Sequence, residues 1–263
     1  MVRSLLIRGL LVGLVAGLAA FGFARWKGEP SVNKAIAFED YVATDIRHEP
    51  HMPAEVSRSV QDSAGLGTGA ILYGVAMGGI FALVFAAAYG RIGLRTARGT
   101  AALLGLLGFV GIYLVPLLKY PANPPAIGQE DTIGKRTVLY LVMVVLSVAA
   151  LVGAVALRRK LVARFGAWNA TLLVGAGYVV AMAVCYLALP GINEVPQAAI
   201  PGVVDAVTDA TVTFPPVVLW NFRVASLGIQ VVVWTVIALG FGALAERLLE
   251  PARRTQFRSS SVA

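Results

Sequence analysis

The chain has 263 residues, of which 58% are apolar and only 14% are charged, and its mean hydropathy is +0.77. A soluble domain carries nearer to a quarter charged residues, so this composition excludes an ordinary soluble protein and indicates an integral membrane protein. The formal charge of +8 does not indicate a nucleic-acid partner, because the arginines gather in short connections between apolar runs, where basic residues set membrane orientation. The single cysteine, Cys185, excludes an internal disulfide and a cysteine metal cluster.

Apolar runs of about 20 residues, long enough to cross roughly 30 Å of hydrocarbon as helices, recur along the chain. We predict an all-α integral membrane protein, a bundle of six transmembrane helices with three extracytoplasmic loops. Arg3 and Arg8 give the first run a basic n-region, so a cleaved signal peptide, leaving five helices, is the alternative. Arg25 and Lys27 after the run favour an uncleaved anchor. The predicted spans of this single membrane domain (residues 1–263) are residues 5–23, 66–89, 100–118, 137–157, 168–189 and 224–244.

Glycines in a GxxxG spacing occur in the first two runs, at Gly13 and Gly17 and at Gly74 and Gly78. Small residues at this spacing let helix backbones approach closely inside a membrane. We therefore expect both runs to take part in close helix packing.

The longest polar segment, residues 24–65, follows the first run and holds seven acidic residues and both histidines of the chain. Pro53, followed by a polar stretch, predicts the start of a short helix with proline in its first turn. We predict that this segment is extracytoplasmic and lies on the membrane surface as one or two short helices.

Basic residues fix the predicted orientation. The links at residues 91–98 and 158–164 hold seven basic residues and no acid, so both are expected to be cytoplasmic. Alternation then places residues 24–65, 119–136 and 190–223 outside and both termini in the cytoplasm. Twelve of the 14 acids fall in these three outer segments, and none falls in a predicted span.

The loop of residues 119–136, KYPANPPAIGQEDTIGKR, separates two of the apolar runs. Its prolines exclude a regular helix, because proline lacks the amide donor and biases its predecessor away from helical angles. Exposed to hydrocarbon, such a backbone would leave polar groups unsatisfied, so it must lie outside the bilayer or be enclosed by protein. We expect the other two outer segments to share a face with it.

His48 and His51 are the most distinctive chemical feature. Two imidazoles three residues apart, beside Asp45, suit a borderline divalent metal such as cobalt, nickel or zinc. Pro50 prevents them from sharing a regular helix face, so they would act from a loop. The alternative is that they are solvated surface residues.

Two further interpretations stay open for the charged residues of the loops. Glu130 and Asp131 form either a carboxylate pair at the mouth of a cation path or capping acids at a helix start. The same alternatives apply to Glu194. Arg136 and Arg223 stand at predicted outer entrances of spans, where they either anchor the helices or pair with loop acids.

Sulfur-bearing residues occur inside the spans, at Met77, Met143, Met182 and Cys185. They would suit a soft metal, although packing is the commoner use of methionine in membrane helices. The sequence has no GxxxxGK[ST] phosphate loop, HExxH or GxSxG, so we predict no enzyme activity and no ATP-driven transport. Passage would then be driven by the membrane potential or by a partner.

Three strings of the outer loops resemble the CbtA family of predicted cobalt transporter subunits. They are LKYPANPPAIGQEDTIGKRT (118–137), LPGINEVP (189–196) and FPPVVLWNFRVASLG (214–228). The similarity extends over nearly the whole chain, including SRSVQDSAGL before the second span. It implies a bacterial inner (plasma) membrane protein linked to cobalt supply for cobalamin synthesis, with a small single-span CbtB-like subunit, histidine-bearing at one end, as its partner. The family is generally described with five spans, whereas we count six.

With this resemblance, we predict a multi-pass membrane subunit of a transporter for cobalt or another divalent cation, which captures the ion on the outer face. His48 and His51 are the expected first contacts, and Glu130, Asp131 and Glu194 form the expected acidic funnel. Cobalt is the transported substrate, and no permanently bound cofactor is expected. The alternative is a non-transporting membrane scaffold or assembly subunit of another complex.

Overall fold

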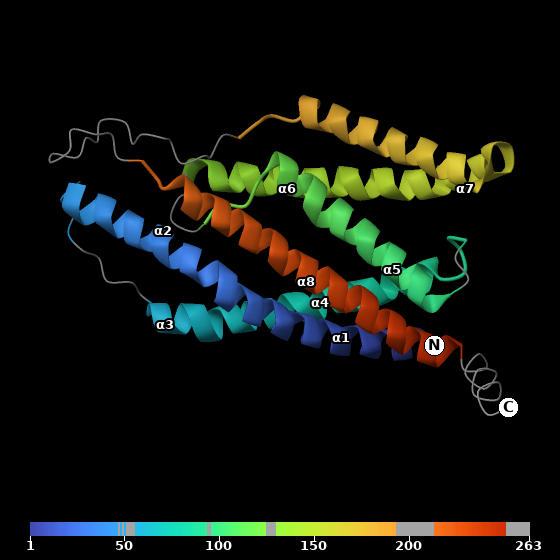
Figure 1. Ribbon diagram of the computed structural model, residues 1–263, viewed down its shortest axis with the longest axis horizontal. Coiled ribbons are helices and arrows are strands. Elements are labelled where there is room, and N and C mark those ends of the chain that lie inside the picture. Colours follow the sequence, from blue (N-terminus) through green and yellow to red (C-terminus); the bar gives the residue numbers. More distant parts are fainter. Residues whose placement is uncertain are drawn as a thin grey trace. The chain divides into compact units, whose positions relative to one another are not determined.

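The computed structural model describes residues 1–46, 48, 50, 56–93, 96–124, 130–192 and 213–250. In these ranges the regular structure is entirely helical, without a strand (Figure 1). The α-helices are α1 (Val2–Phe23), α2 (Glu29–Tyr41), α3 (Arg58–Val60), α4 (Leu66–Ala88), α5 (Ala97–Gly108), α6 (Val115–Lys119), α7 (Glu130–Ala188) and α8 (Pro216–Leu249). Wider π-helical turns adjoin them at η1 (Ala24–Gly28), η2 (Val42–Ile46), η3 (Gln61–Gly65) and η4 (Phe109–Leu114).

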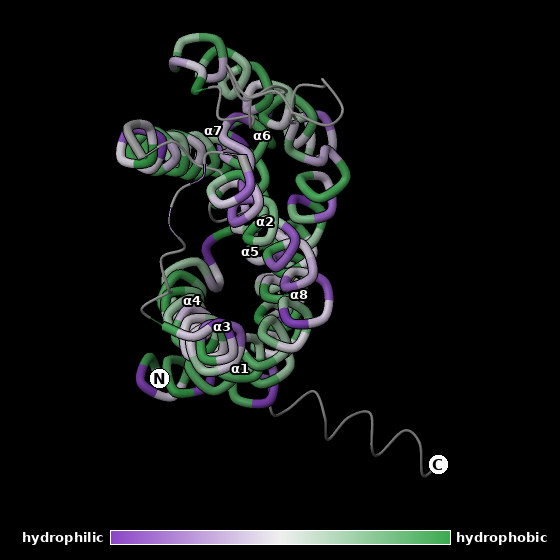
Figure 2. Tube along the Cα trace, turned by 90° about the vertical axis from the view of Figure 1, so that its left-hand side faces the viewer, coloured by the Kyte–Doolittle hydropathy of each residue, from purple (hydrophilic) through white to green (hydrophobic). Residues whose placement is uncertain are grey.

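Among the described residues, five helices are long and apolar enough to cross a membrane. They are Val2–Asp45, Arg58–Ala88, Ala97–Lys119, Thr132–Ala188 and Pro216–Leu249. Hydrophobic positions, green in Figure 2, recur along the helices. The prediction of an all-helical membrane protein is therefore confirmed, whereas the count of six spans stays a prediction.

α7 is a helical pair rather than one rod. Gly166 has φ 76° and ψ 166°, which are not helical angles, and α7 reverses direction in Figure 1. The hydroxyls of Ser147 and Tyr178 are 2.8 Å apart, and Arg158 Nε donates to Thr171 Oγ1 at 2.8 Å. Moving from residue 147 to residue 158 on the first arm, the partner on the second arm moves back from residue 178 to residue 171. The two arms are therefore antiparallel. Gly166 permits the reversal because a residue without Cβ adopts positive φ at no steric cost.

The helix that starts at Val2 does not stop at residue 23, the predicted end of the first span. The backbone stays helical through η1 and α2, and Pro30, which has no amide donor, lies in the first turn of α2 just after the π-helical turn η1. The end of the polar segment is also helical, because α3 and η3 lead directly into α4. Pro53, the predicted helix start, lies outside the described residues.

Contacts divide the chain into two compact units. The first unit comprises Met1–Gly22, Val60–Val110 and Ile229–Ala263. The second unit comprises Phe23–Ser59 and Gly111–Gly228.

The first unit brings α1 and α4 together through their glycines. A Cβ placed on Gly78 would collide with the carbonyl oxygen of Gly9, and one placed on Gly74 would lie 2.6 Å from the backbone nitrogen of Gly17. As the residue number rises from 74 to 78 on α4, the number of the facing residue on α1 falls from 17 to 9, so the two helices are antiparallel. Both GxxxG predictions are confirmed, because these contacts are closer than any side chain would allow.

α5 and α8 of the first unit are packed in the same manner. A Cβ on Gly105 would collide with the Cβ of Ala238, and one on Gly242 would lie 3.1 Å from the Cβ of Ala101. These two helices are also antiparallel. Small residues thus replace large side chains at both interfaces, as expected where van der Waals contact drives helix association.

α4 and α8 run parallel within the first unit. The Tyr73 hydroxyl donates to Gln230 Oε1 at 3.1 Å, and the rings of Phe85 and Phe241 meet edge to face with centroids 5.0 Å apart. Phe85 and Phe241 are fully buried. The core of this unit is therefore aromatic where α4 meets α8 and glycine-packed elsewhere.

Two acidic residues at and just after the end of α8 bind the start of α5 and its preceding link. Glu250 Oε1 accepts from the backbone amide of Ala97 at 2.8 Å and from the Tyr89 hydroxyl at 3.2 Å. Arg98 Nε forms an ion pair with Glu246 at 2.8 Å. A carboxylate at the start of α5 is favourable because the first amides of a helix have no internal acceptor. The end of α8 and the link before α5 thus lie at the same end of this unit.

In the second unit, α2 packs against the start of α8. The rings of Phe38 and Phe214 meet edge to face at 5.2 Å, and Ala35, Val218 and Leu219 are buried in the same cluster. The α2 part of the polar segment therefore packs on the protein through its apolar face.

Candidate functional site

The five predicted metal ligands are only partly described. His48 is exposed and has φ 54°, in the left-handed region that histidine visits more often than most residues. Glu130 and Asp131 lie in the first turn of α7, but their side chains are not among those described, so both interpretations of them stay open. His51 and Glu194 lie outside the described residues altogether. The structure therefore neither assembles nor separates these five residues.

No metal centre can be assigned in the described part of the chain. In those ranges, no group of three or more histidine, cysteine, aspartate or glutamate side chains lies together. The predicted metal contacts accordingly remain predictions. The described residues do, however, define a polar site where the loops meet.

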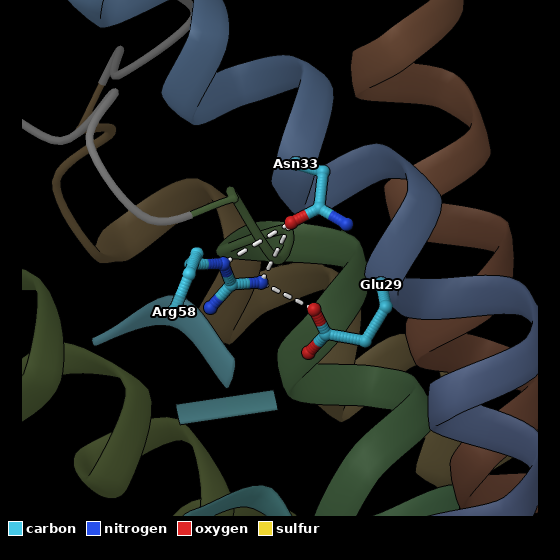
Figure 3. Close-up of polar contacts among 3 residues, drawn as sticks. All are labelled: Glu29, Asn33 and Arg58. Atoms are coloured by element: carbon cyan, nitrogen blue, oxygen red, sulfur yellow. Dashed lines mark hydrogen bonds and ion pairs between the residues drawn. The ribbon is translucent and has the colours of Figure 1, made fainter. Parts of the chain in front are cut away.

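A polar cluster links the segment after the histidines to α2. Arg58 forms an ion pair with Glu29 and donates to Asn33 Oδ1 through Nε at 3.1 Å and through Nη2 at 3.0 Å (Figure 3). Charge-assisted bonds of this kind are among the stronger polar contacts of proteins. This contact holds residue 58 against the beginning of α2, so the histidine-bearing connection is attached to the second unit at both of its ends.

Two arginines hold the extended segment that follows α6. Arg136 of α7 donates to the carbonyl oxygen of Pro121. Arg223 of α8 donates through Nε to the carbonyl oxygen of Ala122 at 3.1 Å and through Nη2 to Asn123 Oδ1 at 3.0 Å. Prolines exclude helical bonds in this segment, so arginines from two helices satisfy its acceptors instead. This bonding was not predicted, because both arginines were expected either to anchor the helices at the interface or to pair with loop acids.

The residues just before that segment bind the end of α7. Tyr120 is only 2% exposed, and its hydroxyl donates to the carbonyl oxygen of Pro190 at 2.9 Å. Lys119 Nζ donates to the carbonyl oxygen of Tyr186 at 2.7 Å and lies 5.0 Å from the centroid of that ring. Burial raises the pKa of Tyr120 above the ordinary 10.0, so its hydroxyl remains a donor at physiological pH.

A second layer of tyrosines joins η4 to α7 and α8. The Tyr113 hydroxyl lies 2.8 Å from Ser226 Oγ, and the Tyr140 hydroxyl donates to the carbonyl oxygen of Ile112 at 3.3 Å. The π-helical turn shifts the backbone hydrogen-bond pattern at this place, and such turns often occur at functional positions.

A cavity of about 330 Å³ lies among these groups in the second unit. Three tyrosines, one arginine and one threonine give it a polar wall, and aliphatic side chains complete it. Its lining is Tyr113, Leu117, Tyr120, Ala122, Ile133, Arg136, Thr137, Tyr140 and Leu141. The hydroxyls of its three tyrosines are already bonded to Ser226, Pro190 and Ile112, whereas Arg136 places a positive charge at the cavity. A cation in its neighbourhood would therefore require nearby carboxylates.

All three strings that carry the family resemblance contribute to this site. Residues 118–137 supply the held segment and Arg136, residues 189–196 supply the Pro190 carbonyl, and residues 214–228 supply Arg223. Segments far apart in the sequence therefore meet in one hydrogen-bonded structure, which we call the loop junction. It comprises residues 119–124, Arg136, Pro190 and Arg223.

Fold and site together define a class: an all-helical, multi-pass membrane protein in which the two connections on either side of α7 share one bonded site. Residues 2–246 match the model of a family described as CbtA, probable cobalt transporter subunit. Since the match covers nearly the whole chain, the protein belongs to the CbtA family, which confirms the resemblance. No curated protein and no solved structure shows a significant match.

Proposed function

We propose that the chain is the membrane subunit that captures cobalt, as a divalent cation, on the outer face of the bacterial inner membrane and passes it inward for cobalamin synthesis. Family membership supports cobalt transport. The observation that carries the finer proposal is the loop junction, in which two of the three predicted outer segments, residues 119–136 and 190–223, meet beside a cavity. No catalytic step is involved, and cobalt is substrate rather than cofactor.

We assign six spans, with α7 crossing twice and both termini in the cytoplasm. The antiparallel α1/α4 and α5/α8 pairs and the parallel α4/α8 pair support this alternation. The contact of Glu250 with Ala97 supports it too, since it places the end of α8 beside the arginine-rich link before α5. Basic links are retained in the cytoplasm.

The ion is captured by acids and imidazoles around the junction. Glu130 and Asp131 begin α7, which also supplies Arg136, and Glu194 follows Pro190 by four residues. His48 and His51 provide the ligand type that cobalt prefers. Carboxylates are required because Arg136 at the cavity repels a bare dication.

A small single-span subunit with a histidine-bearing end is the proposed partner. It supplies imidazole ligands that this chain, with two histidines, has in small number. The membrane potential drives entry, since moving each elementary charge inward through 100 mV provides about 2.3 kcal/mol.

The test is uptake of labelled cobalt in cells without other cobalt importers, with and without the small subunit. Uptake should require this chain and fall about tenfold in Glu130→Gln/Asp131→Asn, since a focused negative potential raises cation encounter by at least that factor. His48→Ala/His51→Ala should lower it as well. The matched control is Glu39→Gln/Asp40→Asn, which removes two neighbouring acids from exposed positions of α2.

Two outcomes would contradict the proposal. If the control pair lowers uptake as much as the Glu130/Asp131 pair, a general surface potential attracts the ion and capture at the junction is wrong. If a correctly inserted chain gives no uptake with its partner present, the protein acts as a scaffold or assembly subunit instead. Protein levels in the membrane must be matched in all variants.

A further inference from the structure

Three of the sulfur-bearing side chains noted in the sequence lie together in the second unit. Met143 is fully buried and Met182 is 7% exposed, and both belong to one packed cluster with Tyr120. Cys185, the only cysteine, is half-buried and packs against this cluster. The sequence alone left two interpretations open for these residues, soft-metal ligands or ordinary packing.

The α7 hairpin brings these three residues into one packed cluster. Met143 is on the first arm of α7, and Met182 and Cys185, three residues apart, share a face of the second arm. Ser147 lies one turn after Met143, and Tyr178 lies one turn before Met182. The hydrogen bond between Ser147 and Tyr178 therefore fixes the register of the two arms. The placement thus follows from the antiparallel pairing and does not depend on a loop.

The surroundings of the cluster are aromatic. Tyr140, Tyr178 and Tyr186 pack against it, in addition to Tyr120 within it. Polarisable thioethers beside rings are ordinary core packing, so burial alone does not define a ligand site. The Cys185 thiol next to the thioethers of Met143 and Met182, however, gives a set of sulfur donors, which prefers soft metal ions.

We propose that Met143, Met182 and Cys185 form a site for a soft monovalent cation, of the class of Cu(I) and Ag(I). Thiolate and thioether ligands select soft ions over borderline dications such as cobalt. On binding, the Cys185 S–H bond breaks, its proton leaves to solvent and a sulfur–metal bond forms without a redox change. The product is electrically neutral, because one thiolate balances one monovalent ion.

Charge also favours the monovalent ion at this place. A dication with one thiolate would leave a net positive charge in a buried, aromatic environment, which is costly. The Lys119 ammonium, 5.0 Å from the Tyr186 ring, adds further positive charge beside the cluster. The cluster shares Tyr120 with the loop junction, but it selects a different class of ion, and this proposal does not rest on the proposed cobalt transport.

The experiment uses the purified full-length protein in detergent micelles with Ag(I) nitrate as the probe. N-ethylmaleimide alkylation of Cys185 is followed by mass spectrometry; because the chain has a single cysteine, every adduct reports on this site. One equivalent of Ag(I) should block alkylation, and one silver ion should remain bound per chain after desalting. Cobalt at the same concentration should not protect the thiol.

Substituting the methionines shows whether Ag(I) is bound by all three residues or by the Cys185 thiol alone. Met143→Leu/Met182→Leu keeps the side-chain volume, and it should require at least tenfold more Ag(I) for the same protection and lose the silver on desalting. The matched control is Met77→Leu, on α4 of the first unit, which should behave like the unaltered chain. Cys185→Ser should retain no silver.

Three results would overturn the proposal: protection unchanged in the double methionine variant, equal protection by cobalt, or no silver retained by the unaltered protein. If Cys185 resists alkylation from the outset, silver retention decides alone. None of these readouts measures cobalt uptake, so failure here and failure of the proposed function are distinguishable.

Discussion

The two compact units are held together by different physical means. The first unit relies on glycine: α1 meets α4, and α5 meets α8, where a single added methyl group would collide with the opposing helix. The second unit relies on side chains that bind backbone carbonyls, as Arg223 binds Ala122 and Tyr120 binds Pro190.

This difference reflects what each kind of backbone requires inside a membrane. Close glycine packing needs no polar group and suits a hydrocarbon environment, where van der Waals contact between helices replaces the hydrophobic effect. Irregular backbone, by contrast, must have its polar groups satisfied by protein wherever water is scarce. The first unit is therefore held by close backbone packing, and the second unit maintains a non-helical segment at which the family strings meet.

The largest effect is expected from breaking the glycine contact of the first unit. Gly74→Ala places a Cβ 2.6 Å from the backbone nitrogen of Gly17 and should destabilise the protein by about 3 kcal/mol through overpacking. Thermal unfolding in detergent measures this loss. Gly69→Ala on the same helix is the control: its Cβ meets nothing within 4 Å, so helix propensity should raise stability by up to about 1 kcal/mol. Equal melting temperatures for the two variants would contradict the close packing.

The next largest effect should appear in the second unit. Arg223→Gln removes charge-assisted bonds to Ala122 and Asn123 and should cost about 2 kcal/mol, confined to the held segment. Amide hydrogen exchange should therefore rise at residues 119–124 and stay unchanged in α1 and α4. Arg223→Lys should restore little, because an ammonium cannot reproduce the fork geometry. Arg159→Gln, at an exposed position of α7, is the charge-matched control; an equal rise in that variant would refute the assignment.

Tyr120→Phe should have a smaller effect, because it removes one neutral hydrogen bond worth about 1 kcal/mol. Since burial raises the folded pKa of Tyr120 above the unfolded value, its contribution is complete below pH 10 and is lost as the pH rises through the folded pKa. Exchange protection at residues 119–124 should thus be constant from about pH 6 to 9. A loss of protection within that window that Tyr120→Phe abolishes would contradict the raised pKa.

The smallest effect is expected between the arms of α7. A double-mutant cycle with Ser147→Ala and Tyr178→Phe should give a coupling energy of about 0.6 kcal/mol, typical of hydrogen bonds between membrane helices. Arg158→Gln combined with Tyr178→Phe is the unlinked control and should give additive effects. A coupling near zero for Ser147 and Tyr178 would indicate that the arms are held by packing alone.

The sequence was sufficient for features that depend on local composition. Apolar runs predicted the membrane-crossing helices, and the GxxxG spacings predicted the contact of Gly74 with Gly17. The polar link predicted between residues 157 and 168 contains Gly166, at which α7 reverses. These signals are readable because each one lies within a single run or link.

Features that depend on contacts between distant segments could not be predicted from the sequence. Arg223 binds a carbonyl oxygen 101 residues earlier, and backbone acceptors carry no signature in a sequence. Tyr120 could have been singled out by its position between lysine and proline, but its acceptor on Pro190 could not. Met143 and Met182 meet only because the hairpin register aligns them. The helical continuation beyond residue 23 was missed since a charged composition was interpreted as a surface segment.

The turn at Gly166 has a consequence for biogenesis. The two arms of α7 are consecutive in the chain, so a ribosome delivers the second arm immediately after the first, and they can pair before α8 has been synthesised. The Ser147–Tyr178 bond lies wholly within this pair, so its polar groups are satisfied without help from later segments. Arg223, in contrast, is synthesised after all other residues of the loop junction, and it binds a segment translated about a hundred residues earlier. Assembly of the loop junction must therefore wait for translation of α8, which makes it a late event in the maturation of the protein.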